Sequence, residues 1–301
     1  MKIELATIIC SKQEIPWLDF GLESILEHTK HDINTTLYLA RYTDEMFEDC
    51  GKVCDKYGIN FEARGDNYPI GYVNEAKHNG FDINGADCVM SLQPDVVFMK
   101  KDGFDKAIDE ASDYFDSKYY ACVSSDNPKD VQPLGITIHT KLGWEKIGCE
   151  DINYYPQCGV EHDYNRRAYI EYGLDLQDSL KYAKYVLGLG ETPPEWVYRV
   201  CSPDLVHLEK DWNQDPRLGG RTGVQHKLLD YGMHLFGDCI IHDSYVLYYV
   251  LKWGAFLGEE HWVVPFNEEE LSIKIEWEQA DDPYPQYNLP PTLKGCIIKW
   301  T

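Results

Sequence analysis

Two groups of acidic side chains border apolar segments, where they could carry out chemistry. Asp95 lies in the segment S-L-Q-P-D-V, residues 91–96, directly after an apolar run, and Glu161 and Asp163 precede a helical pattern. A carboxylate at a strand end suits a divalent cation that bridges a diphosphate, and a positioned carboxylate can deprotonate a hydroxyl group. The alternatives are structural: Asp95 would cap a backbone N–H in a plain turn, and the other two acids would cap a helix.

The glycine motifs of common nucleotide-binding folds are absent. The first apolar run continues into S-K-Q-E, residues 11–14, without the glycines that let a backbone approach a pyrophosphate. Nicotinamide-dependent enzymes and P-loop phosphotransferases are therefore disfavoured.

The first half of the chain alternates strand and helix patterns. We expect strands at residues 3–10, 34–40, 59–63 and 86–92, with helices at 17–28, 44–57 and 72–79 between them. Gly58 closes the second helix, and Gly80 weakens the third. This order predicts an α/β fold whose mostly parallel sheet has helices on both faces. Ligands of such sheets bind at the carboxyl ends of the strands.

The second half is less regular. Strands are expected at 119–124, 134–140, 197–201 and 239–242, and helices at 166–172 and 174–192. From residue 265 onward we expect an irregular, acidic tail. The predicted organisation is one domain over 1–245, with a nucleotide-sugar half (1–125) and an acceptor half (126–245), followed by an extension (246–301) packed on it.

The composition is that of an acidic globular protein. Its 301 residues include 28 Lys and Arg against 51 Asp and Glu, a formal charge of −23, which disfavours nonspecific binding to nucleic acid. Ten scattered cysteines without a C-x-x-C pair indicate reduced, mostly buried thiols, with zinc binding at Cys50 and Cys54 as the alternative. No apolar run approaches a membrane-spanning length, so we expect a soluble, cytoplasmic protein.

Four segments in order resemble family 2 nucleotide-sugar glycosyltransferases over about residues 1–175. They are N-E-A-K-H-N-G (74–80), the strand ending in Q-P-D-V (93–96), G-W-E-K-I-G (143–148) after a strand, and E-H-D-Y-N-R-R (161–167) followed by Gly173. The resemblance implies a GT-A fold, a Rossmann-like α/β domain that transfers a sugar from a nucleoside diphosphate.

Carried over to this sequence, the resemblance makes Asp95 a ligand of Mn²⁺ or Mg²⁺ on the donor diphosphate. Gln93, a further candidate donor contact, stands where the family usually has Asn or Asp, so this sequence has one carboxylate fewer. The general base is Glu161 or Asp163, because His162 replaces the acid of the family's E-D pair. The family also supplies a late histidine to the metal, which is His242 or His207 here, with His242 slightly preferred because Asp243 adjoins it.

The same resemblance places donor contacts at the ends of the first two strands. Cys10, Ser11 and Glu14 follow the first strand, and Thr43 and Asp44 follow the second, where they could also cap a helix. Arg64 and Lys77 are candidate partners of the diphosphate.

The expected function is a metal-dependent, inverting glycosyltransferase with a UDP-sugar as donor and a hydroxyl group as acceptor. The acceptor could be a glycan or a hydroxymethylated base of viral DNA; Arg217, Arg221 and Lys227 around the glycines at 219–223 could form a local basic rim. The alternative is a noncatalytic carbohydrate- or nucleotide-binding protein on the same fold.

Overall fold

The computed structural model describes residues 1–9, 12–39, 42–63, 69–125, 136–151, 160–173, 193–208, 249–255, 260, 262–265, 267, 276–279 and 296–299. The strands are β1 (Lys2–Ile9), β2 (Asp32–Leu39), β3 (Asn60–Ala63), β4 (Cys88–Leu92), β5 (Val96–Phe98), β6 (Tyr120–Ser125), β7 (Ile136–Thr140), β8 (Val197–Ser202), β9 (Leu205–His207), β10 (Glu276–Gln279) and β11 (Cys296–Lys299). The helices are η1 (Lys12–Glu14), α1 (Ile15–Leu26), α2 (Asp44–Tyr57), α3 (Pro69–His78), the π-helical η2 (Asn79–Asn84), α4 (Gly103–Ser112), α5 (Lys141–Ile147) and α6 (Val160–Tyr172).

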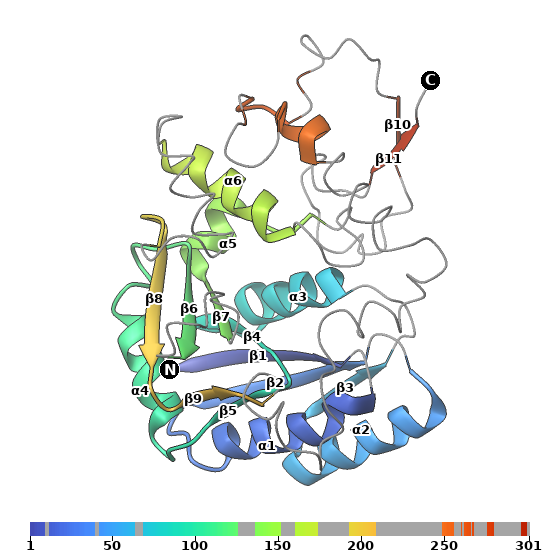
Figure 1. The fold of residues 1–301 in the computed structure, drawn as a ribbon, viewed down its shortest axis with the longest axis vertical. Coiled ribbons are helices and arrows are strands. Elements are labelled where there is room, and N and C mark those ends of the chain that lie inside the picture. The colour runs from blue at the N-terminus through green and yellow to red at the C-terminus, as the bar shows by residue number, and fades with distance from the viewer. Residues whose placement is uncertain are drawn as a thin grey trace.

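A seven-stranded sheet with the order β3-β2-β1-β4-β7-β6-β8 forms the centre of the protein (Figure 1). The pairs β1–β2, β1–β4, β2–β3 and β6–β8 are parallel, whereas β7 runs antiparallel to both of its neighbours. The predicted α/β fold with a mostly parallel sheet is therefore confirmed. The strand order reverses between β1 and β4, which makes their carboxyl ends the switch point of the sheet.

Helices cover both faces of this sheet. Residues of α1, α2 and α4 pack with Ile3, Leu5 and Ile9 of β1 in the larger core, and Tyr72, Ala76 and Phe81 of α3 and η2 pack with Ala6 on the opposite face. Figure 1 shows α1 and α2 on one side of β1 and α3 on the other. The alternation of β1 side chains between the two cores follows from the two-residue period of a strand.

Several elements differ from those expected. Helix α4 was not predicted, α6 begins six residues before the expected 166, and the helix of α3 continues beyond Gly80 as the π-helical η2. The tail expected to be irregular contains the antiparallel pair β10–β11. The helix at 174–192 and the strand at 239–242 lie outside the described residues.

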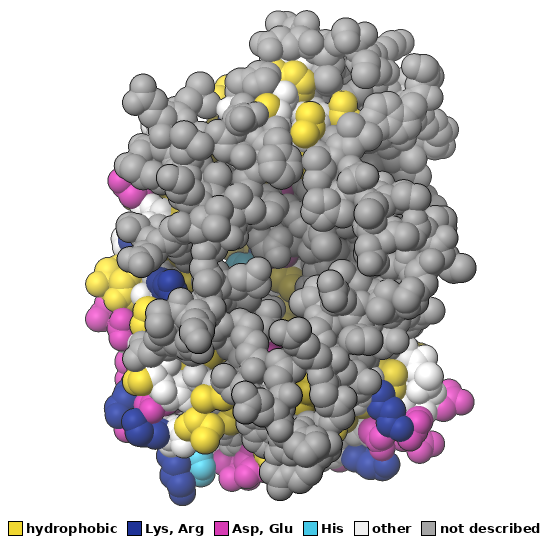
Figure 2. Space-filling model, in the orientation of Figure 1, with side chains coloured by type: hydrophobic (Ala, Val, Ile, Leu, Met, Phe, Trp, Pro, Cys, Tyr) yellow, Lys and Arg dark blue, Asp and Glu magenta, His cyan; other side chains and the backbone are white. Residues whose placement is uncertain are grey.

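Charged side chains of both signs lie at the lower left and lower right of the face in Figure 2, where Figure 1 places α4 and α2. Exposed ion pairs of these helices include Lys56 of α2 with Asp19 of α1, and Lys106 with Asp102 at the start of α4. The lysines there are therefore balanced by acids instead of forming a basic face. Arg217, Arg221 and Lys227 lie outside the described residues.

Cysteines in the described part of the chain are free, and five of the six are buried: Cys50, Cys54, Cys88, Cys122 and Cys149, with Cys201 exposed. Burial raises the pKa of Cys50 and of Cys54 to about 12, so both thiols stay protonated at neutral pH. A zinc ligand must be a thiolate, and this packing disfavours the zinc alternative. No helix among the described residues has the length and hydrophobicity needed to cross a bilayer.

Candidate functional site at the strand ends

Asp95 lies in a turn at the switch point of the sheet. Directly after β4, the N–H of Val96 donates to the carbonyl oxygen of Gln93 at 3.2 Å and closes the turn. Asp95 is only 4% exposed, and Gln93 is half-buried. An acid in a turn that needed only a solvated cap would be exposed, whereas Asp95 is buried and has partners within the protein.

Strand β9 runs beside this turn. It pairs antiparallel with β5, Val96 lies opposite His207, and the N–H of Leu208 donates to the carbonyl oxygen of Asp95 at 2.8 Å. The backbone of His207 is therefore next to Asp95 although 112 residues separate them in the sequence. The side chain of His207 and all of His242 lie outside the described part of the structure. Among the described residues, no three His, Cys, Asp or Glu side chains come together as a metal site.

Gly21 lets α1 approach the strand that follows Asp95. A Cβ atom at Gly21 would lie 2.7 Å from the carbonyl oxygen of Val96 and 3.6 Å from that of Pro94, which is closer to Val96 than packed atoms tolerate. The absence of a side chain at this one helical position therefore fixes how α1 supports the turn.

Replacing Gly21 with Ala should lower the free energy of unfolding by roughly 1–3 kcal/mol, because the backbone of β5 or α1 must shift to admit the methyl group. The matched control is Gly51→Ala in α2, where nothing lies within 4 Å of the new Cβ atom. That change should stabilise the protein by roughly 0.5–1 kcal/mol through helix propensity. Urea unfolding measures both, and equal effects of the two substitutions would contradict the close approach at Gly21.

The predicted donor contacts are partly occupied by structural roles. Thr43 Oγ1 accepts from the N–H of Met46 at 3.3 Å as the N-cap of α2, and Asp44 is exposed in the first turn. Glu14, where α1 begins, is 2% exposed and has partners within the protein. Cys10, Ser11 and Arg64 lie outside the described residues.

Lys77 does not lie where a diphosphate partner is expected. Helix α3 leads from the carboxyl ends of the strands back toward the start of β4, and Lys77 is in its last turn. Its Nζ atom lies 3.1 Å from Glu150 Oε1 and 4.8 Å from the centre of the Tyr164 ring. Burial lowers the pKa of Lys77, and Glu150 opposes this effect. In this position the charge of Lys77 holds Glu150 and Tyr164 of α6 against α3.

Asn74 has a comparable structural role in the N-E-A-K-H-N-G segment. Its Nδ2 atom donates to the carbonyl oxygen of Glu150 at 2.9 Å, and its Oδ1 atom accepts from the Glu150 N–H at 2.8 Å. His139 of β7 lies beside Glu150, and burial lowers its pKa well below the ordinary value, so this histidine is neutral. The motif thus anchors the chain between α5 and α6.

Asp163 occupies the centre of a buried polar network. Its Oδ2 atom accepts from Arg167 Nε at 3.0 Å, and its Oδ1 atom lies 2.7 Å from Lys252 Nζ and 2.9 Å from Trp253 Nε1. Burial would raise the pKa of Asp163, but Lys252 and Arg167 outweigh it and the pKa is lowered. Both oxygens of a fully buried carboxylate are thus engaged, which disfavours Asp163 as a base. Glu161 lies in the same first turn of α6, with its side chain outside the described part.

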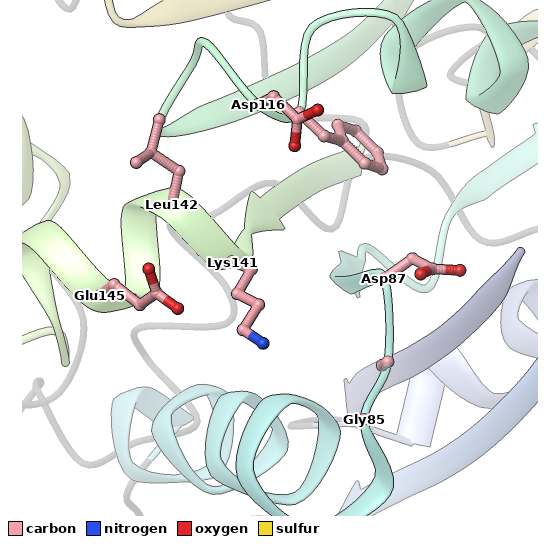
Figure 3. Close-up of a pocket in the computed structure, with 8 residues that line it drawn as sticks. Gly85, Asp87, Asp116, Lys141, Leu142 and Glu145 are labelled. Carbon is pink, nitrogen blue, oxygen red and sulfur yellow. The ribbon is translucent and has the colours of Figure 1, made fainter.

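A polar hollow of about 390 Å³ lies at the opposite end of the strands, where β4 begins. Its lining includes Asp87, which leads into β4, and Asp116, Lys141 and Glu145 (Figure 3). Figure 3 shows the Lys141 side chain extending from α5 into the space between Glu145 and Asp87. The hollow contains none of the predicted site residues and is separate from the strand-end site.

No protein-family model matches the sequence, and no curated protein matches it either. Solved structures to which this chain is similar include a cytidylyltransferase from Leptospira borgpetersenii serovar Hardjo-bovis, with 12% identity, a TM-score of 0.43, and coverage of 70% of this chain and 83% of that one. Another is glucosyl-3-phosphoglycerate synthase from Mycobacterium tuberculosis in complex with Mn²⁺, UDP and glucosyl-3-phosphoglycerate, with 11% identity, a TM-score of 0.42, and coverage of 72% and 77%.

A third is residues 1–349 of TarS from S. aureus in complex with UDP-GlcNAc, with 12% identity, a TM-score of 0.40, and coverage of 57% of this chain and 54% of that one. These likenesses are too distant to assign an activity. The residues of this chain must carry the functional proposal.

Proposed function

We propose that the protein is a glycosyltransferase that uses a nucleoside diphosphate sugar, with a UDP-sugar as the expected donor and a hydroxyl group as the acceptor. The observation that carries this proposal is the buried Asp95 at the switch point of the sheet, beside the backbone of His207. A ligand at this edge would lie against the ends of β1 and β4, as in other open α/β sheets.

Mn²⁺ or Mg²⁺ would be held by the Asp95 carboxylate, with His207 as the second protein ligand. Carboxylate oxygen is the ligand type these cations prefer, and oxygens of the donor diphosphate would supply further positions. The pairing of β9 with β5 favours His207 over His242, which reverses the preference drawn from the sequence. A cation bound there neutralises the charge of the leaving nucleoside diphosphate.

Glu161 is the proposed general base. Of the two acids in the motif, Asp163 has both oxygens engaged by cations and an indole N–H, so Glu161 is the one left to deprotonate the acceptor. A single displacement of this kind inverts the configuration at the anomeric carbon. The acceptor class stays as expected from the sequence, a glycan or a hydroxymethylated base of viral DNA.

Replacing Asp95 with Asn should weaken the binding of UDP in the presence of Mn²⁺ by at least about 10- to 100-fold, the loss typical of even the outer partners of a metal. Calorimetric titration with UDP, with and without Mn²⁺, measures it. The matched control is Asp116→Asn, an exposed acid of the hollow at the opposite end of the strands, which should bind like the wild type. Equal affinities of both variants would remove Asp95 from the donor site.

A noncatalytic binding protein is the second candidate, and the engagement of Asp163 favours it, because one of the two candidate bases has a structural role. A screen of nucleotide sugars for binding and for hydrolysis distinguishes the two. Donor binding with neither transfer nor hydrolysis for any sugar would support the second candidate.

A further inference from the structure

Lys252 is a buried ammonium group between two buried carboxylates. Its Nζ atom lies 2.5 Å from Asp151 Oδ2 and 2.7 Å from Asp163 Oδ1. Lys252 is 1% exposed, and both acids are 0% exposed. Because one nitrogen contacts both carboxylates, Lys252 bridges two buried acids that would otherwise repel each other.

The three residues come from segments far apart in the chain. Asp151 follows the segment that Asn74 holds, Asp163 is in the first turn of α6, and Lys252 lies in a helical segment that includes residues 249–253. The adjacent Trp253 also donates to Asp163, at 2.9 Å. This late segment, residues 249–253, therefore contacts α6 with two consecutive side chains, those of Lys252 and Trp253.

Arg167 completes the arrangement from within α6. Besides Asp163, it donates to the carbonyl oxygens of Ile147 at 2.7 Å and Cys149 at 2.8 Å, which join α6 to the end of α5. Two carboxylates, Asp151 and Asp163, thus meet two cations, Lys252 and Arg167, and the buried group is neutral. Of these two cations, Lys252 is the one that forms ion pairs with both acids in the described part of the structure.

We propose that Lys252 is a positioning residue for the reaction: by holding Asp163 against Asp151, it fixes the first turn of α6 and with it Glu161, two residues earlier. This proposal rests on the proposed function, in which Glu161 acts as the base. A base must lie within hydrogen-bond reach of the acceptor hydroxyl, and a misplacement of about 1 Å can cost about 100-fold in rate. The late segment would then serve catalysis without touching the substrate.

The test compares Lys252→Met with Lys146→Met. Lys146 pairs with Glu171 at the other end of α6, at 3.1 Å, and both partners are exposed, so its removal leaves the first turn intact. We expect Lys252→Met to lower turnover by about 10- to 100-fold with UDP affinity unchanged, and Lys146→Met to resemble the wild type. Lys252→Arg should restore part of the turnover, since it keeps a cation between the acids.

A double-mutant cycle separates positioning from a general loss of stability. If Lys252 acts through Glu161, Glu161→Gln combined with Lys252→Met should be no slower than Glu161→Gln alone. The proposal would be overturned if adding Lys252→Met to Glu161→Gln lowered turnover by as large a factor as Lys252→Met does in the wild type. Should Lys252→Met fail to fold, Lys252→Met combined with Asp151→Asn replaces it, because that pair of changes removes the second acid and leaves Asp163 its ion pair with Arg167.

Hydrogen exchange of the full-length protein gives a second readout that needs no turnover. Peptides covering 160–166 should exchange faster in Lys252→Met than in the wild type, while peptides covering α2 should not change. Unchanged exchange over 160–166 would overturn the positioning role. Absence of transfer and hydrolysis in the wild type, with faster exchange in the variant, would instead refute the proposed function and retain Lys252 as the residue that holds α6.

Discussion

Asp163→Ala should lower the free energy of unfolding by about 3–5 kcal/mol, the loss typical when one partner of a buried ion pair is removed. The substitution would leave the side chains of Lys252, Arg167 and Trp253 without the carboxylate that all three contact. Lys252 would keep Asp151, and Arg167 would keep two carbonyl oxygens, so the network would be broken but not eliminated. Urea unfolding followed by circular dichroism gives the value.

The control for this prediction is Glu171→Ala, which removes the exposed partner of Lys146 at the other end of α6. Surface ion pairs contribute little because water screens them, so this variant should unfold close to the wild type. Asp163→Asn keeps the shape and one acceptor for Trp253 while removing the charge. A loss for Asp163→Ala no larger than for Glu171→Ala would show that the buried network does not hold α6.

The charge of Asp163 also predicts a pH dependence. Its pKa is lowered in the folded protein from an ordinary value of 3.8, so its contribution to stability is complete above that value and is lost as the pH falls through the lowered one. The difference in unfolding free energy between wild type and Asp163→Asn should therefore be constant near neutral pH. It should become smaller only when the pH falls below about 3.8. A difference that changed between pH 5 and 7 would contradict the lowered pKa.

The sequence predicted those helices and strands that are defined by local features such as caps, glycines and apolar runs. The helix expected at 44–57 has those bounds in the structure, because Thr43 caps its first turn and Gly58 takes a left-handed φ of 65° after its last. The parallel core strands followed from apolar runs between short links, within one to two residues of the bounds observed. The unpredicted α4 has buried Phe104, Ala107, Ile108 and Ala111 at helical spacing, a signal that could have identified it.

The candidate site was harder to predict because its contacts join distant segments. The ion pair between Lys252 and Asp151 spans 101 residues, and no spacing rule relates them. The same holds for β9, whose pairing with β5 brings the backbone of His207 to Asp95, and for Glu150, which pairs with Lys77 in the last turn of α3. The sequence identifies these side chains as candidates. Their partners depend on how the sheet packs against α6, which no local pattern predicts.

Glu161→Gln should lower turnover by about 100-fold or more while the affinity for the donor stays nearly constant. The amide keeps the size of the side chain but cannot take the acceptor proton, and general base catalysis contributes about 10²- to 10⁴-fold. The loss therefore falls on an interaction made mainly in the transition state. Single-turnover kinetics with saturating donor, together with calorimetry of UDP binding, measure the two quantities separately.

The comparison with Asp163→Asn decides which acid is the base, provided that both variants are assayed at a temperature where they are folded. Asp163→Asn should lower stability more than Glu161→Gln does, because Asp163 pairs with the buried Lys252 and with Arg167, whereas Glu161→Gln should show the larger loss in the chemical step. A direct displacement assisted by one carboxylate inverts the anomeric centre, and NMR of the product reads its configuration. A product that retains the configuration of the donor would exclude Glu161 as a simple base and require a second displacement.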